Sequence, residues 1–132
     1  MILLFDTHPL LWAVAGNDQF SRRAEVAARD TANRVYVSEA SLREIAERSS
    51  TGALHVPEGW LLGRREMLAS AGIGVLDVTA ELRQRARALK ALGGDRYDQL
   101  IGAQALLLAG RGETAVLARD PVFERYGIRR IW

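Results

Sequence analysis

Cysteine is absent from this chain of 132 residues, and histidine and proline are scarce, with two and three residues. Without cysteine there is no disulfide framework, thiolate nucleophile or thiolate zinc site, and two histidines are too few for a histidine metal centre. No apolar stretch reaches the roughly 18 residues that span a membrane, and the start of the sequence lacks a signal-peptide pattern. These absences favour a cytoplasmic protein without membrane contact.

Lysine is nearly absent as well, since Lys90 is the sole lysine among 18 basic residues. Arginine binds phosphate groups through a bidentate guanidinium fork, so this arginine-rich chain of net charge +2 is suited to phosphate contacts. A solvated helix face is the simpler explanation for any single arginine. The candidate phosphate contacts are Arg22, Arg23, Arg83, Arg85, Arg87, Arg119, Arg129 and Arg130.

Short apolar runs alternate with helical patterns along the chain, which is 48% hydrophobic and can bury a full core. Such alternation predicts right-handed crossovers and a parallel sheet covered by helices on both faces. We therefore expect an α/β fold, with one three-layer α/β/α domain over residues 1–132 and a central, mainly parallel sheet of four to five strands. The predicted strands are 2–5, 35–37, 72–76, 114–117 and 128–132. The predicted helices are 8–12, 22–30, one that opens at 38–41 and continues to Glu47, 60–71, 80–89 and 95–109.

Four carboxylates lie where such a sheet collects them. Asp6 and Asp120 follow the apolar runs 2–5 and 114–117, and parallel sheets bind ligands beyond the carboxyl ends of their strands. Glu44 and Asp98 lie in the opening turns of helices that begin at the same edge. Because converging carboxylates without cationic partners need a metal ion, the pattern predicts a divalent-cation site.

Each acid also has a local explanation. Independent roles at helix starts and turns would account for any one of them, so the geometry favours a metal site without excluding these roles. Whether Asp95 joins the cluster stays open, because helix capping suffices for it. The local roles are a helix start at Asp6 with Thr7 as the favoured N-cap, a capping box of Ser41 with Glu44, an acid in the first turn for Asp98 behind an Asp95 N-cap, and a turn at Asp120 with Pro121.

Taken together, four segments of the chain match a known pattern: residues 2–8 with 10–12, residues 37–46, residues 95–105, and residues 119–121 with Phe123 and 126–127. In these segments the sequence resembles the PIN-domain ribonucleases, and within them the VapC-type toxins of bacterial toxin–antitoxin pairs. The resemblance covers essentially the whole length. It implies a PIN-like version of the expected fold.

The resemblance also implies a function. Acids matching Asp6, Glu44 and Asp98 hold Mg²⁺ or Mn²⁺ in that family, and the position of Asp120 completes the site. The implied activity is a metal-dependent endoribonuclease that leaves a 5′-phosphate and a 3′-hydroxyl on single-stranded or loop RNA. The implied partners are a cognate antitoxin that blocks the site and a second copy of the chain in a homodimer.

Some positions depart from the family pattern. Relatives often carry Thr or Ser where this chain has Ala118, a histidine two residues before Asp95 where it has Gly93, and a basic residue where it has Gln99. Ala118 and the missing histidine leave open a non-catalytic domain of the same fold that binds RNA or protein, whereas the retention of all four acids argues against it. A structure-specific DNA nuclease is a third reading, because the same carboxylates would serve it.

Overall fold

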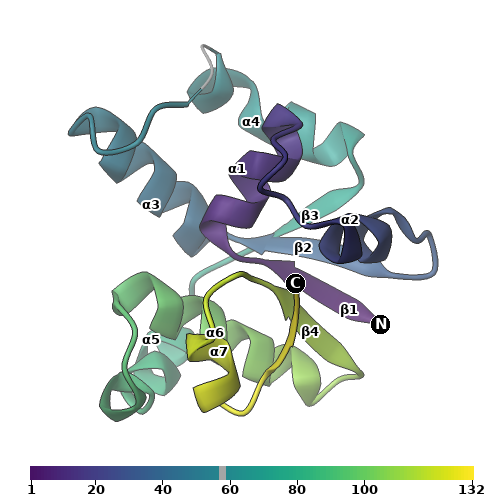
Figure 1. The fold of residues 1–132 in the computed structure, drawn as a ribbon. Helices are drawn as coiled ribbons and strands as arrows, with labels where there is room; N and C mark the ends of the chain where they lie inside the picture. Colours follow the sequence, from purple (N-terminus) through teal and green to yellow (C-terminus); the bar gives the residue numbers. More distant parts are fainter. Residues whose placement is uncertain (57–58) are drawn as a thin grey trace.

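A five-stranded parallel sheet forms the centre of the molecule (Figure 1). The computed structural model describes residues 1–56 and 59–132. The strands lie in the order β3-β2-β1-β4-β5, and every neighbouring pair is parallel. The expected parallel sheet is thus confirmed with five strands. They are β1 (Ile2–Phe5), β2 (Arg34–Ser38), β3 (Ile73–Leu76), β4 (Thr114–Leu117) and β5 (Arg129–Ile131).

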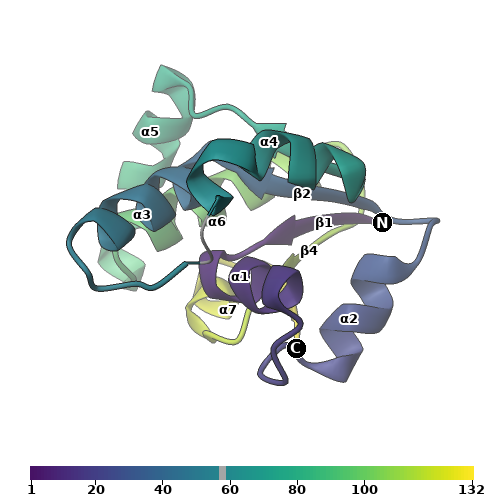
Figure 2. The same ribbon diagram turned by 90° about the horizontal axis from the view of Figure 1, so that it is seen from above.

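Helices cover both faces of this sheet and complete the predicted three layers (Figures 1 and 2). Within the described ranges, no helix combines the length and apolar character needed to cross a bilayer. One face packs against α1 (Thr7–Ala15), α2 (Arg22–Arg29), α3 (Glu39–Ser50) and α4 (Trp60–Ser70), and the other against α5 (Ala80–Arg87), α6 (Arg96–Ala109) and α7 (Val122–Arg125). The 3-10 turn η1 (Lys90–Leu92) follows α5.

Strand β1 shows why the apolar runs are continuous rather than alternating. Leu3 and Phe5 enter the core beneath α1 to α4, whereas Leu4 enters the core beneath α5 to α7. All three side chains are at most 2% exposed. A strand that is buried on both faces needs apolar residues at every position, and this need explains the run before Asp6.

The predicted elements differ from the observed ones at a few places. Helix α1 runs to Ala15, three residues beyond the predicted end, whereas α3 begins at Glu39, within the segment 38–41 that was predicted to open it. The turn predicted at Asp120 and Pro121 is followed by the four-residue helix α7, which has too few residues to show a helical period. The helix predicted at 60–71 is confirmed as α4, and Pro57 before it lies outside the described residues.

The order of the strands places a topological switch point at one edge of the sheet. Strands β2 and β3 lie on one side of β1, and the later strands β4 and β5 lie on the other side. In register, Phe5 of β1 pairs with Val37 of β2 and with Leu117 of β4. The topological switch point therefore lies between the carboxyl ends of β1 and β4, where parallel sheets form their binding crevice.

Candidate active site

Asp6 follows β1 directly at this switch point. Its backbone N–H donates to the carbonyl of Leu117 at 3.1 Å, which ties it to the end of β4. Its side chain caps α1, because Oδ1 accepts the N–H of Thr7 at 2.8 Å. The predicted N-cap role of Thr7 is therefore wrong. Thr7 is instead 1% exposed, and its hydroxyl donates to the hydroxyl of Ser41 at 3.1 Å.

Glu44 lies in the second turn of α3 and is 5% exposed. The N-cap of this helix is Ser38, whose hydroxyl accepts the N–H of Ala40 at 3.1 Å. The capping box predicted for Ser41 and Glu44 is therefore wrong, because the helix starts three residues earlier. Glu44 is thus free of any capping role and is held in the interior by its place on the helix.

Asp98 and Asp95 form a reciprocal cap at the start of α6. Asp95 Oδ1 accepts the N–H groups of Tyr97 and Asp98 at 2.9 Å, and Asp98 Oδ2 accepts the N–H of Asp95 at 2.9 Å. The predicted Asp95 N-cap is confirmed. Capping occupies one oxygen of Asp98 and leaves the other without a hydrogen bond to the described chain.

Asp120 lies three residues beyond the end of β4. Its Oδ1 accepts the N–H of Val122 at 2.9 Å, so it stabilises the turn that begins α7, as the sequence predicted. Ala118, at the position where relatives often carry a hydroxyl, is completely buried. No side-chain hydroxyl therefore supports Asp120 from that position.

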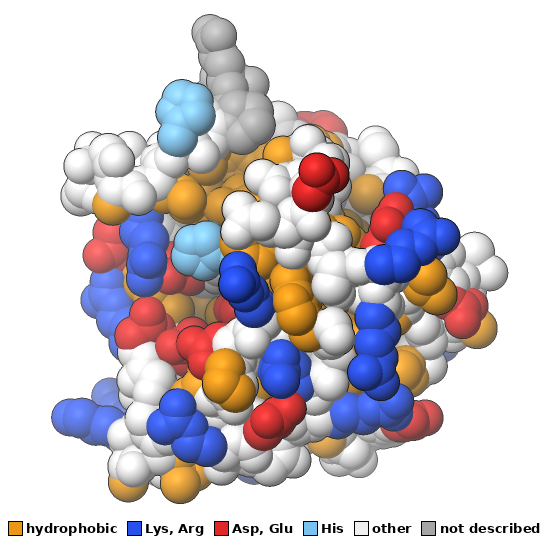
Figure 3. Space-filling model, viewed as in Figure 1, with side chains coloured by type: hydrophobic (Ala, Val, Ile, Leu, Met, Phe, Trp, Pro, Cys, Tyr) orange, Lys and Arg blue, Asp and Glu red, His pale blue; other side chains and the backbone are white. Residues whose placement is uncertain are grey.

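The four predicted acids line one cavity of about 650 Å³. Figure 3 shows acidic side chains beside a hollow in this face of the molecule, with basic side chains around it. The predicted convergence of strand ends and helix starts thus occurs. We call this hollow the acid cavity; its lining includes Asp6, Glu44, Asp98 and Asp120, together with Asp95, His8, Arg48 and Arg119.

Burial and mutual repulsion perturb two of these acids. The pKa of Asp6 is raised from 3.8 to about 7, chiefly by burial and also by the charges of Asp98, Glu44 and Asp120, against the opposing hydrogen bond from the Thr7 N–H. Burial also raises the pKa of Asp98 to about 6, assisted by the charges of Asp95, Asp120 and Glu44. The carboxylates are therefore close enough to repel one another, and a cation among them would relieve that repulsion.

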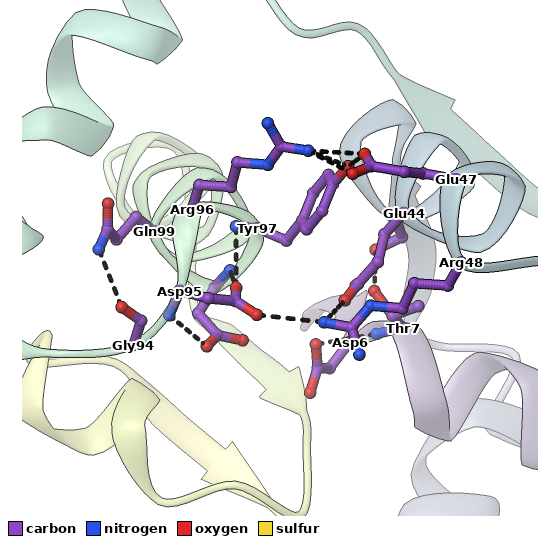
Figure 4. Close-up of polar contacts among 12 residues, drawn as sticks. Asp6, Thr7, Glu44, Glu47, Arg48, Gly94, Asp95, Arg96, Tyr97 and Gln99 are labelled. Carbon is purple, nitrogen blue, oxygen red and sulfur yellow. Dashed lines mark hydrogen bonds and ion pairs between the residues drawn. The ribbon is translucent and has the colours of Figure 1, made fainter. Parts of the chain in front are cut away.

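Arg48 supplies part of the missing positive charge. Its Nη2 lies 2.8 Å from Glu44 Oε2 and 3.3 Å from Asp95 Oδ2, so one guanidinium joins α3 to the start of α6 (Figure 4). The Arg48 side chain is 39% exposed, whereas that of Glu44 is 7% exposed. Arg48 thus neutralises a buried acid from the solvent side of the cavity.

The donor set fits a hard divalent cation. All four predicted ligands are carboxylates, and Mg²⁺ combines a few carboxylates with several waters in its octahedral shell. Among the described residues, however, no group of three or more potential ligands stands close enough together to hold a metal ion. The Arg48–Glu44 ion pair and the capping bonds hold the side chains in other arrangements, so a full coordination shell would need side-chain movement and water.

Sequence reasoning did not single out His8 and Arg48 as lining residues. His8 stands two residues after Asp6, and Arg48 stands four residues after Glu44, a spacing at which helical side chains meet. That spacing is the signal that would have indicated Arg48. Among the predicted phosphate-binding arginines, Arg119 lines the acid cavity, whereas Arg85 pairs with Glu81 outside it.

Comparisons with known proteins bear on this arrangement. The family model described as PIN domain matches residues 3–128 of the chain. A solved structure with a TM-score of 0.67 and 18% sequence identity, covering 100% of both chains, is described as the crystal structure of VapBC2 from Rickettsia felis bound to a DNA fragment from their promoter. At that identity the likeness concerns the fold. A comparison with curated proteins gives no match.

Proposed function

This chain belongs to the PIN domain family, and from that membership we propose that it is a metal-dependent endoribonuclease, a toxin of the VapC type. One observation carries the proposal. Four acids from four separate segments line a single cavity at the switch point of the sheet. Local capping explains three of them singly, but it does not explain the buried Glu44, which caps nothing.

The proposed metal ligands are Asp6, Glu44 and Asp98, with Asp120 completing the set, and the proposed ion is Mg²⁺ or Mn²⁺. When bound, the metal supplies Lewis-acid activation of water and neutralises charge on the leaving oxygen of a phosphodiester. The hydrogen bond between Thr7 and Ser41 joins the start of α1 to α3, and thereby fixes Asp6 relative to Glu44. Arg119 is exposed on the cavity lining, where its guanidinium would bind a substrate phosphate.

The proposed substrate is single-stranded or loop RNA. Its exposed backbone bends into a recessed site, whereas a stiff duplex does not. Hydrolysis would leave a 5′-phosphate and a 3′-hydroxyl. A cytoplasmic setting belongs to the same proposal, because the substrate is cellular RNA.

The proposed partners are a cognate antitoxin and a second copy of the chain. The structural likeness to a VapBC2 complex supports the antitoxin, since that complex has the same fold in one of its chains. The homodimer rests on the family resemblance. Cationic antitoxin side chains facing the acids would block the cavity.

A second candidate is a domain of this fold that binds RNA or protein without cutting. The Arg48–Glu44 ion pair favours it, because a fixed guanidinium would occupy one proposed metal ligand. A DNA nuclease with the same carboxylates is the remaining alternative.

We predict that Asp6→Asn loses cleavage by about two orders of magnitude or more, because it removes one negative ligand while the amide oxygen still caps α1. The test incubates labelled single-stranded RNA, and separately single-stranded DNA, with Mg²⁺, Mn²⁺ or EDTA. Asp18→Asn is the matched control, since Asp18 is exposed and outside the acid cavity.

The outcomes separate the candidates. Metal-dependent RNA cutting by wild type and by Asp18→Asn, but not by Asp6→Asn, supports the proposal. Preferential DNA cutting indicates the DNA nuclease, and RNA binding without cutting indicates the non-catalytic domain. Cutting by Asp6→Asn at the wild-type rate, from contaminant-free protein, refutes the catalytic assignment.

A further inference from the structure

A second hollow, of about 370 Å³, lies beside the acid cavity and has the opposite character. Three arginines from three different helices line it: Arg43 of α3, Arg83 of α5 and Arg96 of α6. Glu47 is the one acid on its lining, and Tyr97 contributes an aromatic ring. We call it the arginine hollow. A concave surface with this excess of guanidinium groups is suited to an anion.

The two hollows share a wall made of α3 and α6. Neighbouring residues divide between them, because successive helical residues turn by about 100°. Arg43 and Glu47 face the arginine hollow, whereas Glu44 and Arg48 face the acid cavity. At the start of α6, Arg96 and Tyr97 face the arginine hollow, whereas Asp95 and Asp98 face the acid cavity. An RNA strand bound in one hollow would therefore lie one helix width, about 10 Å, from the other hollow.

The three arginines are engaged to different degrees. Arg43 pairs with Glu39 at 3.1 Å, and Arg96 pairs with Glu47 at 2.6 Å. The exposed guanidinium of Arg83 makes no hydrogen bond or ion pair in the described part of the chain. Its donors are thus available to a ligand without breaking an internal contact.

A purely structural account covers only part of this arrangement. Glu47 accepts hydrogen bonds from Arg96 and from the Tyr97 hydroxyl, and the Arg96 guanidinium lies 4.8 Å from the centre of the Tyr97 ring (Figure 4). This network fastens α3 to α6. It does not account for Arg83, which comes from α5 and has its donors free.

We propose that the arginine hollow binds the phosphodiester backbone of the RNA strand whose scissile bond lies in the acid cavity. The inference rests on the proposed function and extends it by assigning a second site to the same strand. Arg83 is the principal contact, with Arg43 and Arg96 shaping the local field. The two hollows would have different roles. The negative charge of the acid cavity repels the RNA backbone, and the adjacent arginines attract it.

The test measures binding without chemistry. Arg83→Gln is made in the Asp6→Asn protein, and affinity for a fluorescein-labelled single-stranded oligoribonucleotide is measured by fluorescence anisotropy over a series of KCl concentrations. Arg85→Gln is the matched control, because it removes the same charge from the same helix at a residue that pairs with Glu81 outside the hollow. We expect Arg83→Gln to weaken binding about 3- to 10-fold and to lower the salt slope by about 1.

Equal affinities and salt slopes for Arg83→Gln and Arg85→Gln would overturn the inference. If wild-type protein still cuts RNA in that case, the proposed function stands and only the second site is lost. If wild-type protein neither cuts nor binds RNA, the proposed function fails and takes this inference with it. A selective loss for Arg83→Gln, with an unchanged melting temperature, supports the assignment.

Discussion

At the scale of single residues, three of the four acids combine a cap or turn with a place on the lining of the acid cavity. Asp6, Asp98 and Asp120 each use one carboxylate oxygen to accept a backbone N–H, and each leaves the second oxygen for the acid cavity. The local and functional readings of the sequence are therefore compatible. Asparagine keeps the capping oxygen and removes the charge, which makes Asp→Asn the substitution that isolates the site from the fold.

Arg48 is the residue for which the structure makes the sharpest prediction. Arg48→Gln leaves the buried Glu44 without its cationic partner, so we expect the metal-free protein to lose about 1–2 kcal/mol of unfolding free energy. We also expect Mn²⁺ to bind about 3- to 10-fold more tightly, because the guanidinium no longer competes for Glu44. Urea unfolding in EDTA measures the first quantity, and titration calorimetry measures the second.

Arg43→Gln is the matched control for this experiment. Arg43 pairs with Glu39 on the same helix at the same spacing, yet both side chains are more exposed than Glu44. Its loss should cost well under 1 kcal/mol and leave Mn²⁺ binding unchanged. Identical behaviour of the two variants would show that Arg48 does not hold Glu44.

The four acids were predictable because strand ends and helix starts are visible in the sequence. The helix caps were harder to predict. Asp6 and Thr7 are adjacent and both residue types suit an N-cap, so the sequence does not show at which of the two α1 begins. Ser38 and Ser41 posed the same choice three residues apart. The Arg48–Glu44 contact follows the i, i+4 spacing of a helix. Its place on the acid cavity depends on where α6 packs against α3, and local sequence patterns do not predict that packing.

At the scale of elements, the loop before α6 holds its acids by close packing. Gly94 has φ of +81°, and a Cβ there would clash first with the Tyr126 hydroxyl and would also lie 3.0 Å from Asp98 Cβ and 3.1 Å from Val122 Cγ2. The Tyr126 hydroxyl donates to the carbonyl of Gly93 at 2.7 Å and fastens the loop to the end of α7. The glycine therefore sets the position of Asp98 as well as the turn.

We predict that Gly94→Ala lowers the unfolding free energy by about 2–4 kcal/mol, combining left-handed strain with crowding. Gly127→Ala is the control, since Gly127 has φ of +80° but a Cβ added there would meet nothing within 4 Å. It should cost only about 1 kcal/mol. Urea unfolding curves compare the two, and equal losses would mean that crowding against Tyr126, Asp98 and Val122 contributes nothing.

Long or strongly apolar elements were predicted best. Strand β4 matches its predicted residues 114–117 at both ends, because four apolar-compatible residues lie between clear breakers. Helix α7 escaped prediction, since its four residues follow a proline turn and complete barely one helical turn. Its formation depends on packing of Val122 and Phe123 into the core, a tertiary effect.

At the scale of the whole molecule, alternation of strands and helices determined the layers but not the strand order. The parallel sheet and its two covered faces followed from the pattern. The placement of β4 beside β1 did not, because it depends on which side of β1 the returning chain pairs. That pairing is what brings Asp120 to Asp6.

Stability should depend on pH in a direction opposite to the usual one for carboxylates. The pKa of Asp6 is raised to about 7 and that of Asp98 to about 6, so between the ordinary carboxyl range and pH 7 the folded state binds more protons than the unfolded state. The unfolding free energy in EDTA should therefore fall as pH rises from 5 to 8, by on the order of 1–2 kcal/mol.

Divalent metal should reverse this trend. Under the proposed function, Mg²⁺ or Mn²⁺ would bind the ionised acids, so the rise in Tm that metal produces should be largest above pH 7 and small near pH 5. Thermal unfolding across this range, with EDTA or with metal, measures both effects, and Asp6→Asn should flatten both curves. If the Tm of wild-type protein changed neither with pH nor with metal, the acid cavity would not be a preformed metal site.

The pairing of β1 with β4 also has a consequence for synthesis. Asp6 and Asp120 meet only after the strand at Thr114–Leu117 has joined the sheet. A nascent chain that has emerged from the ribosome only as far as α6 contains three of the acids but neither the fourth nor the strand that closes the switch point. Under the proposed function, the nuclease would become active only after β4 has been synthesised and has paired with β1.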